Sequence, residues 1–136
     1  MIIDSSAILA ILFGEPDAAL YAEAIAMAGT TTQGVRISAA TYVEAAVVVE
    51  SHSSTAGAQQ FDALIRRAGI VVEAVTEEQA QLARQAYSDF GKGRHPAGLN
   101  FDDCFSYALA EAAREPLLFK GNDFSHTDIE RVFLAA

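Results

Sequence analysis

Four carboxylates spread along the chain have the side chains and positions of metal ligands. Asp4 directly follows an apolar pair, and Asp123 closely follows the apolar run 117–119. Glu44 and Asp103 fall in segments of helical character. Two unit charges about 4 Å apart repel by about 4 kcal/mol at an effective dielectric constant of about 20, so a site that gathers these acids needs a cation. Mg²⁺ or Mn²⁺ suits carboxylate ligands and activates water against phosphate, which predicts phosphodiester hydrolysis.

Each acid taken alone also has an ordinary structural interpretation. Asp4 can cap a helix, Glu44 can lie on a solvated face, and Asp123 can be a turn residue. Asn100 and Asp103 have the three-residue spacing of a reciprocal helix cap. The metal hypothesis therefore depends on all four carboxylates meeting at one place.

Polar neighbours of these acids are candidates for supporting roles. Ser6 lies two residues after Asp4, where its hydroxyl can either hold the Asp4 carboxylate or cap a helix. Asp102 and Asp103 point about 100° apart on a helix, so the two cannot serve one ion in the same way. Whether Asp102 or Asn122 assists the site stays open at this point.

The apolar pattern predicts strands that alternate with helices. Short apolar runs predict strands at 2–3, 35–38, 70–75, 117–119 and 131–134. Capping residues, apolar spacing and glycine stops predict helices over 5–12, 16–28, 41–51, 56–68, 76–90 and 101–114. This order is typical of a three-layer α/β/α sandwich with a central parallel sheet of about five strands.

A parallel sheet of this kind would bring the four acids together. Ligands of such sheets bind beyond the carboxyl ends of the strands. Asp4 follows the first predicted strand and Asp123 the fourth, so both belong to that edge. Glu44 lies near the start of the helix after the second strand, and Asp103 lies in the first turn of the helix before the fourth. We therefore expect one acidic site at this edge.

Composition limits the kind of protein. The 136 residues are 51% apolar and 20% charged, which predicts a single globular domain over 1–136 with no membrane span. The start of the chain lacks the features of a signal peptide. Cys104 is the single cysteine, and we expect it to be a small buried side chain in a reducing compartment, the cytoplasm.

The net charge of −9 argues against broad electrostatic binding to nucleic acid. One local basic patch stands out, because Lys92 and Arg94 lie in the glycine- and proline-containing loop 91–98. These side chains are candidates to hold a phosphate backbone, although basic residues in an exposed loop are more often simply solvated. We consider Lys92 and Arg94 as phosphate-binding residues only because the four acids predict phosphodiester hydrolysis.

Four segments together resemble a known family. They are Met1-Ile2-Ile3-Asp4-Ser5-Ser6-Ala7, Tyr42-Val43-Glu44, Gly98-Leu99-Asn100-Phe101-Asp102-Asp103-Cys104 and Leu117-Leu118-Phe119-Lys120-Gly121-Asn122-Asp123-Phe124. In order and spacing they resemble the PIN domain, and within that family the VapC ribonuclease toxins of bacterial toxin–antitoxin pairs. The resemblance implies that the family's metal-site acids and its supporting hydroxyl correspond to Asp4, Glu44, Asp103, Asp123 and Ser6.

The same resemblance implies an activity and partners. It implies cleavage of RNA that depends on Mg²⁺ or Mn²⁺, a homodimer, and inhibition by a VapB-like antitoxin. The loop that carries Lys92 and Arg94 resembles a loop near the RNA path in one VapC subset, which implies substrate contacts for both.

Two alternatives remain at this stage. One is a catalytically inactive PIN-like module that only binds a protein partner. The other is a haloacid-dehalogenase-like phosphatase with Asp4 as nucleophile, although its motif needs a second Asp where Ser6 stands.

Overall fold

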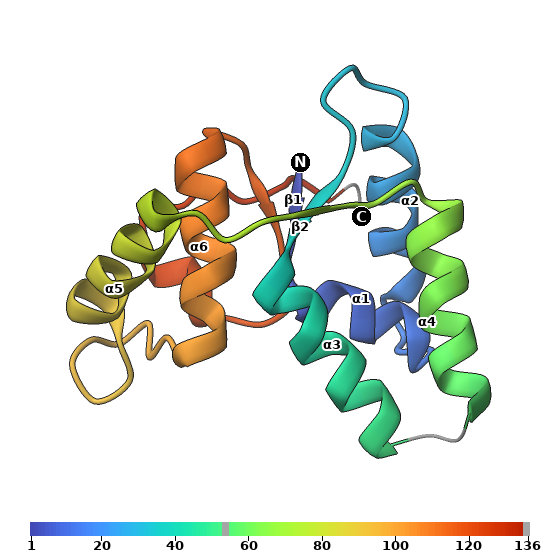
Figure 1. Ribbon diagram of the computed structural model, residues 1–136, viewed down its shortest axis with the longest axis horizontal. Helices are drawn as coiled ribbons and strands as arrows, with labels where there is room; N and C mark the ends of the chain where they lie inside the picture. The colour runs from blue at the N-terminus through green and yellow to red at the C-terminus, as the bar shows by residue number, and fades with distance from the viewer. Residues whose placement is uncertain (53–54, 135–136) are drawn as a thin grey trace.

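A short parallel sheet forms the centre of the computed structural model, which describes residues 1–52 and 55–134. Its four strands have the order β3-β2-β1-β4, and every neighbouring pair is parallel. The strands are β1 (Ile2–Ile3), β2 (Arg36–Ser38), β3 (Val71–Glu73) and β4 (Leu117–Leu118). The parallel α/β architecture predicted from the sequence is confirmed (Figure 1).

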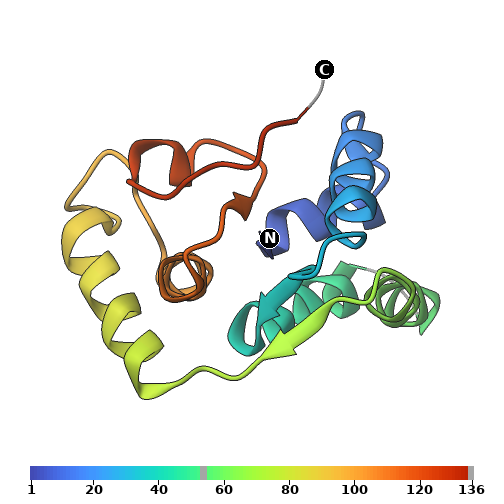
Figure 2. The same cartoon turned by 90° about the horizontal axis from the view of Figure 1, so that it is seen from above.

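Within residues 1–52 and 55–134, six α-helices and one 3₁₀-helix surround this sheet. They are α1 (Ser5–Leu12), α2 (Ala18–Ala28), α3 (Ala39–His52), α4 (Thr55–Arg67), α5 (Glu77–Phe90), α6 (Phe101–Ala113) and η1 (Asp123–His126). Figure 2 shows α1 to α4 on one side of the strands and α5 and α6 on the other. None of the helices in the described residues is long and apolar enough to cross a membrane.

Two hydrophobic cores lie on opposite faces of the sheet. Successive side chains of a strand point to opposite faces, so the two residues of β1 separate. Ile3 packs with Ile8 of α1 and Val49 of α3, whereas Ile2 packs with Leu109 of α6 and Leu99. Ile2 and Ile3 have no exposed surface. Their packing on both faces fixes the backbone position of Asp4, the residue that follows.

The segment 41–51, whose sequence is compatible with strand or helix, is helical within α3 as predicted. Thr41, Ala45 and Val49 are its buried residues, four positions apart. Gly69 has a φ of +64° just after α4, the left-handed ending predicted for it. Cys104 is buried, also as predicted.

The fifth strand predicted at 131–134 does not form. In this segment only Arg131 pairs with the sheet, through an isolated parallel bridge to Leu117. Leu117 N donates to Glu130 O at 2.9 Å, and Val132 N donates to Leu117 O at 3.1 Å. Since β4 has only two residues, it offers too little backbone for a longer ladder on this side. Beyond the bridge, Phe133 is 89% exposed.

Candidate metal centre

Asp4 is the best-fixed carboxylate of the site. Its backbone N donates to Leu118 O at 2.9 Å, which places it where β1 ends beside β4. It is also the N-cap of α1, and its side chain is only 4% exposed. Oδ2 accepts hydrogen bonds from Ser6 N at 3.0 Å and Ser6 Oγ at 2.7 Å, while Oδ1 accepts one from Ser106 Oγ at 2.6 Å. Both carboxylate oxygens are therefore oriented by the protein.

Ser6 connects Asp4 to the neighbouring strand end. Its Oγ donates to Asp4 and accepts a hydrogen bond from Lys120 N at 2.9 Å. Of the two interpretations open at the level of sequence, the helix cap is wrong for Ser6, because Asp4 is the N-cap and Ser6 lies inside α1; support of the Asp4 carboxylate is the role that the contacts show. Lys120 lies two residues after β4, so this bond joins the start of α1 to the segment that leads from β4 to Asp123.

Two buried hydroxyls, Ser106 and Thr41, belong to the site but were not identified from the sequence. Thr41 Oγ1 lies 3.1 Å from Ser106 Oγ, and neither residue is exposed. Because the single Ser106 hydroxyl hydrogen is donated to Asp4, Thr41 donates to Ser106. A signal did exist: Ser106 follows Asp103 by three residues and Thr41 precedes Glu44 by three, which puts each hydroxyl one helical turn from an acid.

Asp103 fills a structural role and faces the other acids at the same time. Its Oδ2 accepts from Asn100 N at 3.0 Å, and Asn100 Oδ1 accepts from Asp103 N at 2.9 Å, which completes the predicted capping box at the start of α6. Glu44 arrives from α3, where its Oε1 accepts from Ser5 Oγ at 3.3 Å. Asp123 is the exposed first residue of η1.

Glu44 and Asp103 both have raised pKa values, and neighbouring carboxylates contribute to each shift. Burial, together with the nearby charges of Asp102, Asp4 and Asp103, raises the pKa of Glu44 to about 7 against the lowering effect of the Ser5 hydrogen bond. Burial is also the main cause that raises the pKa of Asp103 to about 7; the Asn100 backbone bond opposes it, and the charges of Asp4, Asp123 and Asp102 contribute to the rise. Every predicted acid therefore repels at least one other, and Asp102 joins the same cluster.

This donor set suits a hard divalent cation that keeps water ligands. In the described parts of the chain, no three His, Cys, Asp or Glu side chains form a ready-made ligand group. Mg²⁺ usually binds one or two carboxylates directly and retains several waters. The buried Asp4 and the half-buried Asp103 are candidates for direct contact, and the half-buried Glu44 and the exposed Asp123 are candidates to bind the ion through water. The oxygen-only chemistry fits Mg²⁺ or Mn²⁺ and does not suit zinc.

Lys92 and Arg94 lie beside this centre and not in it. Both are exposed on the loop that joins α5 to α6. The Arg94 guanidinium stands 5.7 Å from the centre of the Tyr87 ring, and Lys92 lines a groove between the two helices.

Comparison with known proteins identifies the family. The PIN domain model matches residues 1–130. Ribonuclease VapC28 of Mycobacterium tuberculosis is 56% identical over 132 residues, which cover 96% of both chains. The chain belongs to the VapC family of PIN domains. Ribonuclease VapC of Mycolicibacterium smegmatis is a further relative, 48% identical over 97% of this chain and 99% of its own.

Solved structures share the PIN fold. VapC20 of Mycobacterium tuberculosis, described as a toxin that cleaves the sarcin-ricin loop, superposes with a TM-score of 0.74 at 18% identity, covering 96% of this chain and 97% of its own. A toxin–antitoxin complex from Klebsiella pneumoniae gives 0.69 at 16% identity, covering 93% and 92%. PIN membership, predicted from the four sequence segments, is confirmed, and the haloacid-dehalogenase-like alternative falls away.

Proposed function

We propose that this protein is an endoribonuclease that hydrolyses RNA phosphodiester bonds with Mg²⁺ or Mn²⁺ and acts as the toxin of a toxin–antitoxin pair. The observation that carries the proposal is the Asp4 carboxylate, which Ser6 and Ser106 hold on both oxygens and whose charge contributes to the raised pKa values of Glu44 and Asp103. Membership of the VapC ribonucleases supports the same activity.

The side chains of the site have different roles in the proposed hydrolysis. A divalent ion, when bound, would supply a Lewis acid for a phosphate oxygen and would activate water. Asp4 and Asp103 would hold the ion, and the fixed orientation of Asp4 would set its position. Glu44 and Asp123 would orient a water molecule, and Glu44 would accept its proton. Ser6, Ser106 and Thr41 position the Asp4 carboxylate and do not touch the substrate.

The proposed partners are RNA, a VapB-like antitoxin and a second copy of the chain, acting in the cytoplasm. The fold is shared with a toxin from a toxin–antitoxin complex, which supports an antitoxin partner. A net charge of −9 also suits a basic partner segment that covers the acids. Lys92 and Arg94 supply local positive charge for RNA.

The test is metal-dependent cleavage by the purified protein. We expect cleavage of single-stranded RNA with Mg²⁺ or Mn²⁺, and none with EDTA. Asp4→Asn and Asp103→Asn each lower the rate by at least about a hundred-fold, because both keep their helix caps but lose a metal-binding charge. Asp62→Asn, on the exposed side of α4, is the matched control and cleaves normally.

Two results would contradict the assignment. If both site variants cleave at the wild-type rate, the activity belongs to a contaminating nuclease. If the wild-type protein binds its antitoxin tightly but shows no metal-dependent cleavage, the chain is an inactive PIN-like binding module.

A further inference from the structure

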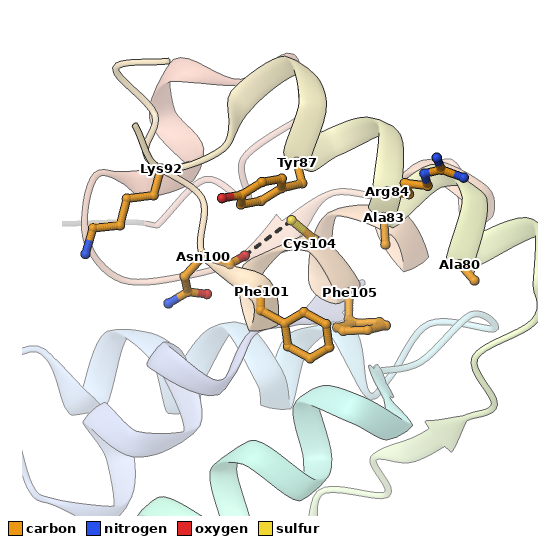
Figure 3. A pocket seen from close by; sticks show the side chains of 9 residues that line it. All are labelled: Ala80, Ala83, Arg84, Tyr87, Lys92, Asn100, Phe101, Cys104 and Phe105. Atoms are coloured by element: carbon orange, nitrogen blue, oxygen red, sulfur yellow. Dashed lines mark hydrogen bonds between the residues drawn. The ribbon is translucent and has the colours of Figure 1, made fainter. Parts of the chain in front are cut away.

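A groove of about 630 Å³ opens between α5 and α6 (Figure 3). Aromatic side chains from both helices line it: Tyr87 comes from α5, and Phe101 and Phe105 come from α6. Phe101 is 73% exposed and Tyr87 is 41% exposed. The Phe101 and Phe105 rings meet edge to face with centres 5.0 Å apart. Phe105 also packs against a core, whereas the Phe101 and Tyr87 rings belong to neither core and leave flat apolar surface exposed in the groove.

The charge around this groove is opposite to that of the whole protein. The charged side chains that line it are Arg84 and Lys92, both cationic and exposed, on a chain of net charge −9. Arg94 adds a third cation, with its guanidinium 5.7 Å above the Tyr87 ring. A ligand that fills this space would thus present an apolar ring and negative charge together.

The groove adjoins the metal centre through a single side chain. Asn100 lines the groove, and the same residue forms the capping box with Asp103. Phe101 and Asp103 both lie in the first turn of α6, so the groove and the acid begin from the same end of this helix.

We propose that this groove is a subsite for single-stranded RNA, in which a base stacks on Phe101 or Tyr87 while Lys92 and Arg84 bind the neighbouring phosphates. Aromatic platforms combined with cationic side chains are how proteins bind single strands, because every base has a face that can stack. The proposal rests on the ribonuclease function proposed above and extends it to the substrate conformation. A base-paired strand cannot present a free base face, so cleavage would favour unpaired RNA.

Steady-state cleavage of a fluorogenic single-stranded oligonucleotide with Mn²⁺ tests the subsite. We expect Phe101→Ala to raise KM about ten-fold with kcat within about two-fold, since one lost stacking contact typically weakens binding by about five- to a hundred-fold. Phe101→Tyr keeps the ring and stays near wild type. Phe101→Leu keeps apolar volume without a ring and behaves like Phe101→Ala. Phe133→Ala, at another exposed phenylalanine, is the control and leaves KM unchanged.

Direct binding in EDTA gives an independent readout that needs no cleavage. An oligonucleotide carrying 2-aminopurine should lose fluorescence on binding, because the probe is quenched when it stacks, and Phe101→Ala should remove much of this quenching. Lys92→Gln should lower the slope of log Kd against log salt by about 0.7, the contribution of one phosphate contact in a single strand.

Three outcomes separate the possibilities. If the wild-type protein cleaves RNA but Phe101→Ala and Phe101→Leu change neither KM nor quenching, the subsite is wrong and the ribonuclease function stands. If cleavage is absent but quenching depends on Phe101, the subsite stands and the ribonuclease function fails. If the Phe101 variants change only self-association or antitoxin binding, the groove is a protein interface and the proposal is overturned.

Discussion

Glu44→Gln should stabilise the metal-free protein, although it changes a residue of the proposed active site. In the folded protein, burial and the charges of Asp102, Asp4 and Asp103 raise the pKa of Glu44 from 4.5 to about 7. Between these pH values the folded state binds more protons than the unfolded state, so the free energy of unfolding falls as the pH rises. Glutamine keeps the oxygen that accepts from Ser5 and removes the charge that is repelled.

The size of the effect follows from the difference between the two pKa values. At about 1.4 kcal/mol for each pH unit, moving from 4.5 to about 7 sets an upper limit of about 3 kcal/mol. Glu44 is half-buried and partly screened by water, which reduces the expected gain to about 1–2 kcal/mol. For a chain of this size, that gain raises the Tm by about 3–8 °C.

The assay is thermal unfolding in EDTA at pH 8 and at pH 4. The Tm difference between Glu44→Gln and wild type should be full at pH 8, where Glu44 is charged in both states. It should vanish at pH 4, where the carboxyl is protonated in both. Glu50→Gln, on the exposed side of the same helix, is the matched control and should show no such difference. A variant that is equally or less stable at pH 8, or a gain that persists at pH 4, would refute the reasoning.

Two further predictions concern the same cluster. Ser106→Ala removes the donor to Asp4 and leaves the Thr41 hydroxyl buried without its partner, so we expect a loss of about 1–3 kcal/mol in urea unfolding and about ten-fold slower cleavage. Adding Thr41→Val should restore most of the stability but not the rate; recovery of both would show that the hydroxyls act only on stability. Mn²⁺ at a hundred times its Kd should raise the unfolding free energy by about 2.7 kcal/mol, measured by thermal shift. Asp103→Asn should abolish most of that stabilisation, and an unchanged shift would place the ion elsewhere.

The main elements and the sheet edge that Asp4 and Asp123 follow could be predicted, because their signals are local or follow from topology. Caps, glycine stops and apolar runs mark the elements, and a parallel sheet brings the residues after β1 and β4 to one edge. The spacing of Ser106 and Thr41 from Asp103 and Glu44 was too weak a signal to single them out, because a hydroxyl in an apolar helix looks alike whether it bonds its own backbone or a distant carboxylate. The strand at 131–134 failed because pairing depends on the length of its partner, which the segment itself does not encode.

The α5–α6 groove lay beyond sequence reasoning for a related reason. Phe101 falls at the first position of a helix and Tyr87 near the end of another, and the spacing of each is compatible with burial. Only the packing of α5 against α6 shows that both rings remain exposed and share one space. Lys92 was recognised as part of a basic loop, but not as the cationic edge of an aromatic groove.

The hydrogen bonds of the Asp4 carboxylate connect the two helical layers of the protein. Ser6 belongs to α1, which packs in one core, and Ser106 belongs to α6, which packs in the other. A slide of either layer by a fraction of an ångström would lengthen one set of bonds and turn the carboxylate. The orientation of the Asp4 carboxylate should therefore be lost more easily than the fold. We expect the proposed cleavage activity to fall on warming at temperatures below the Tm.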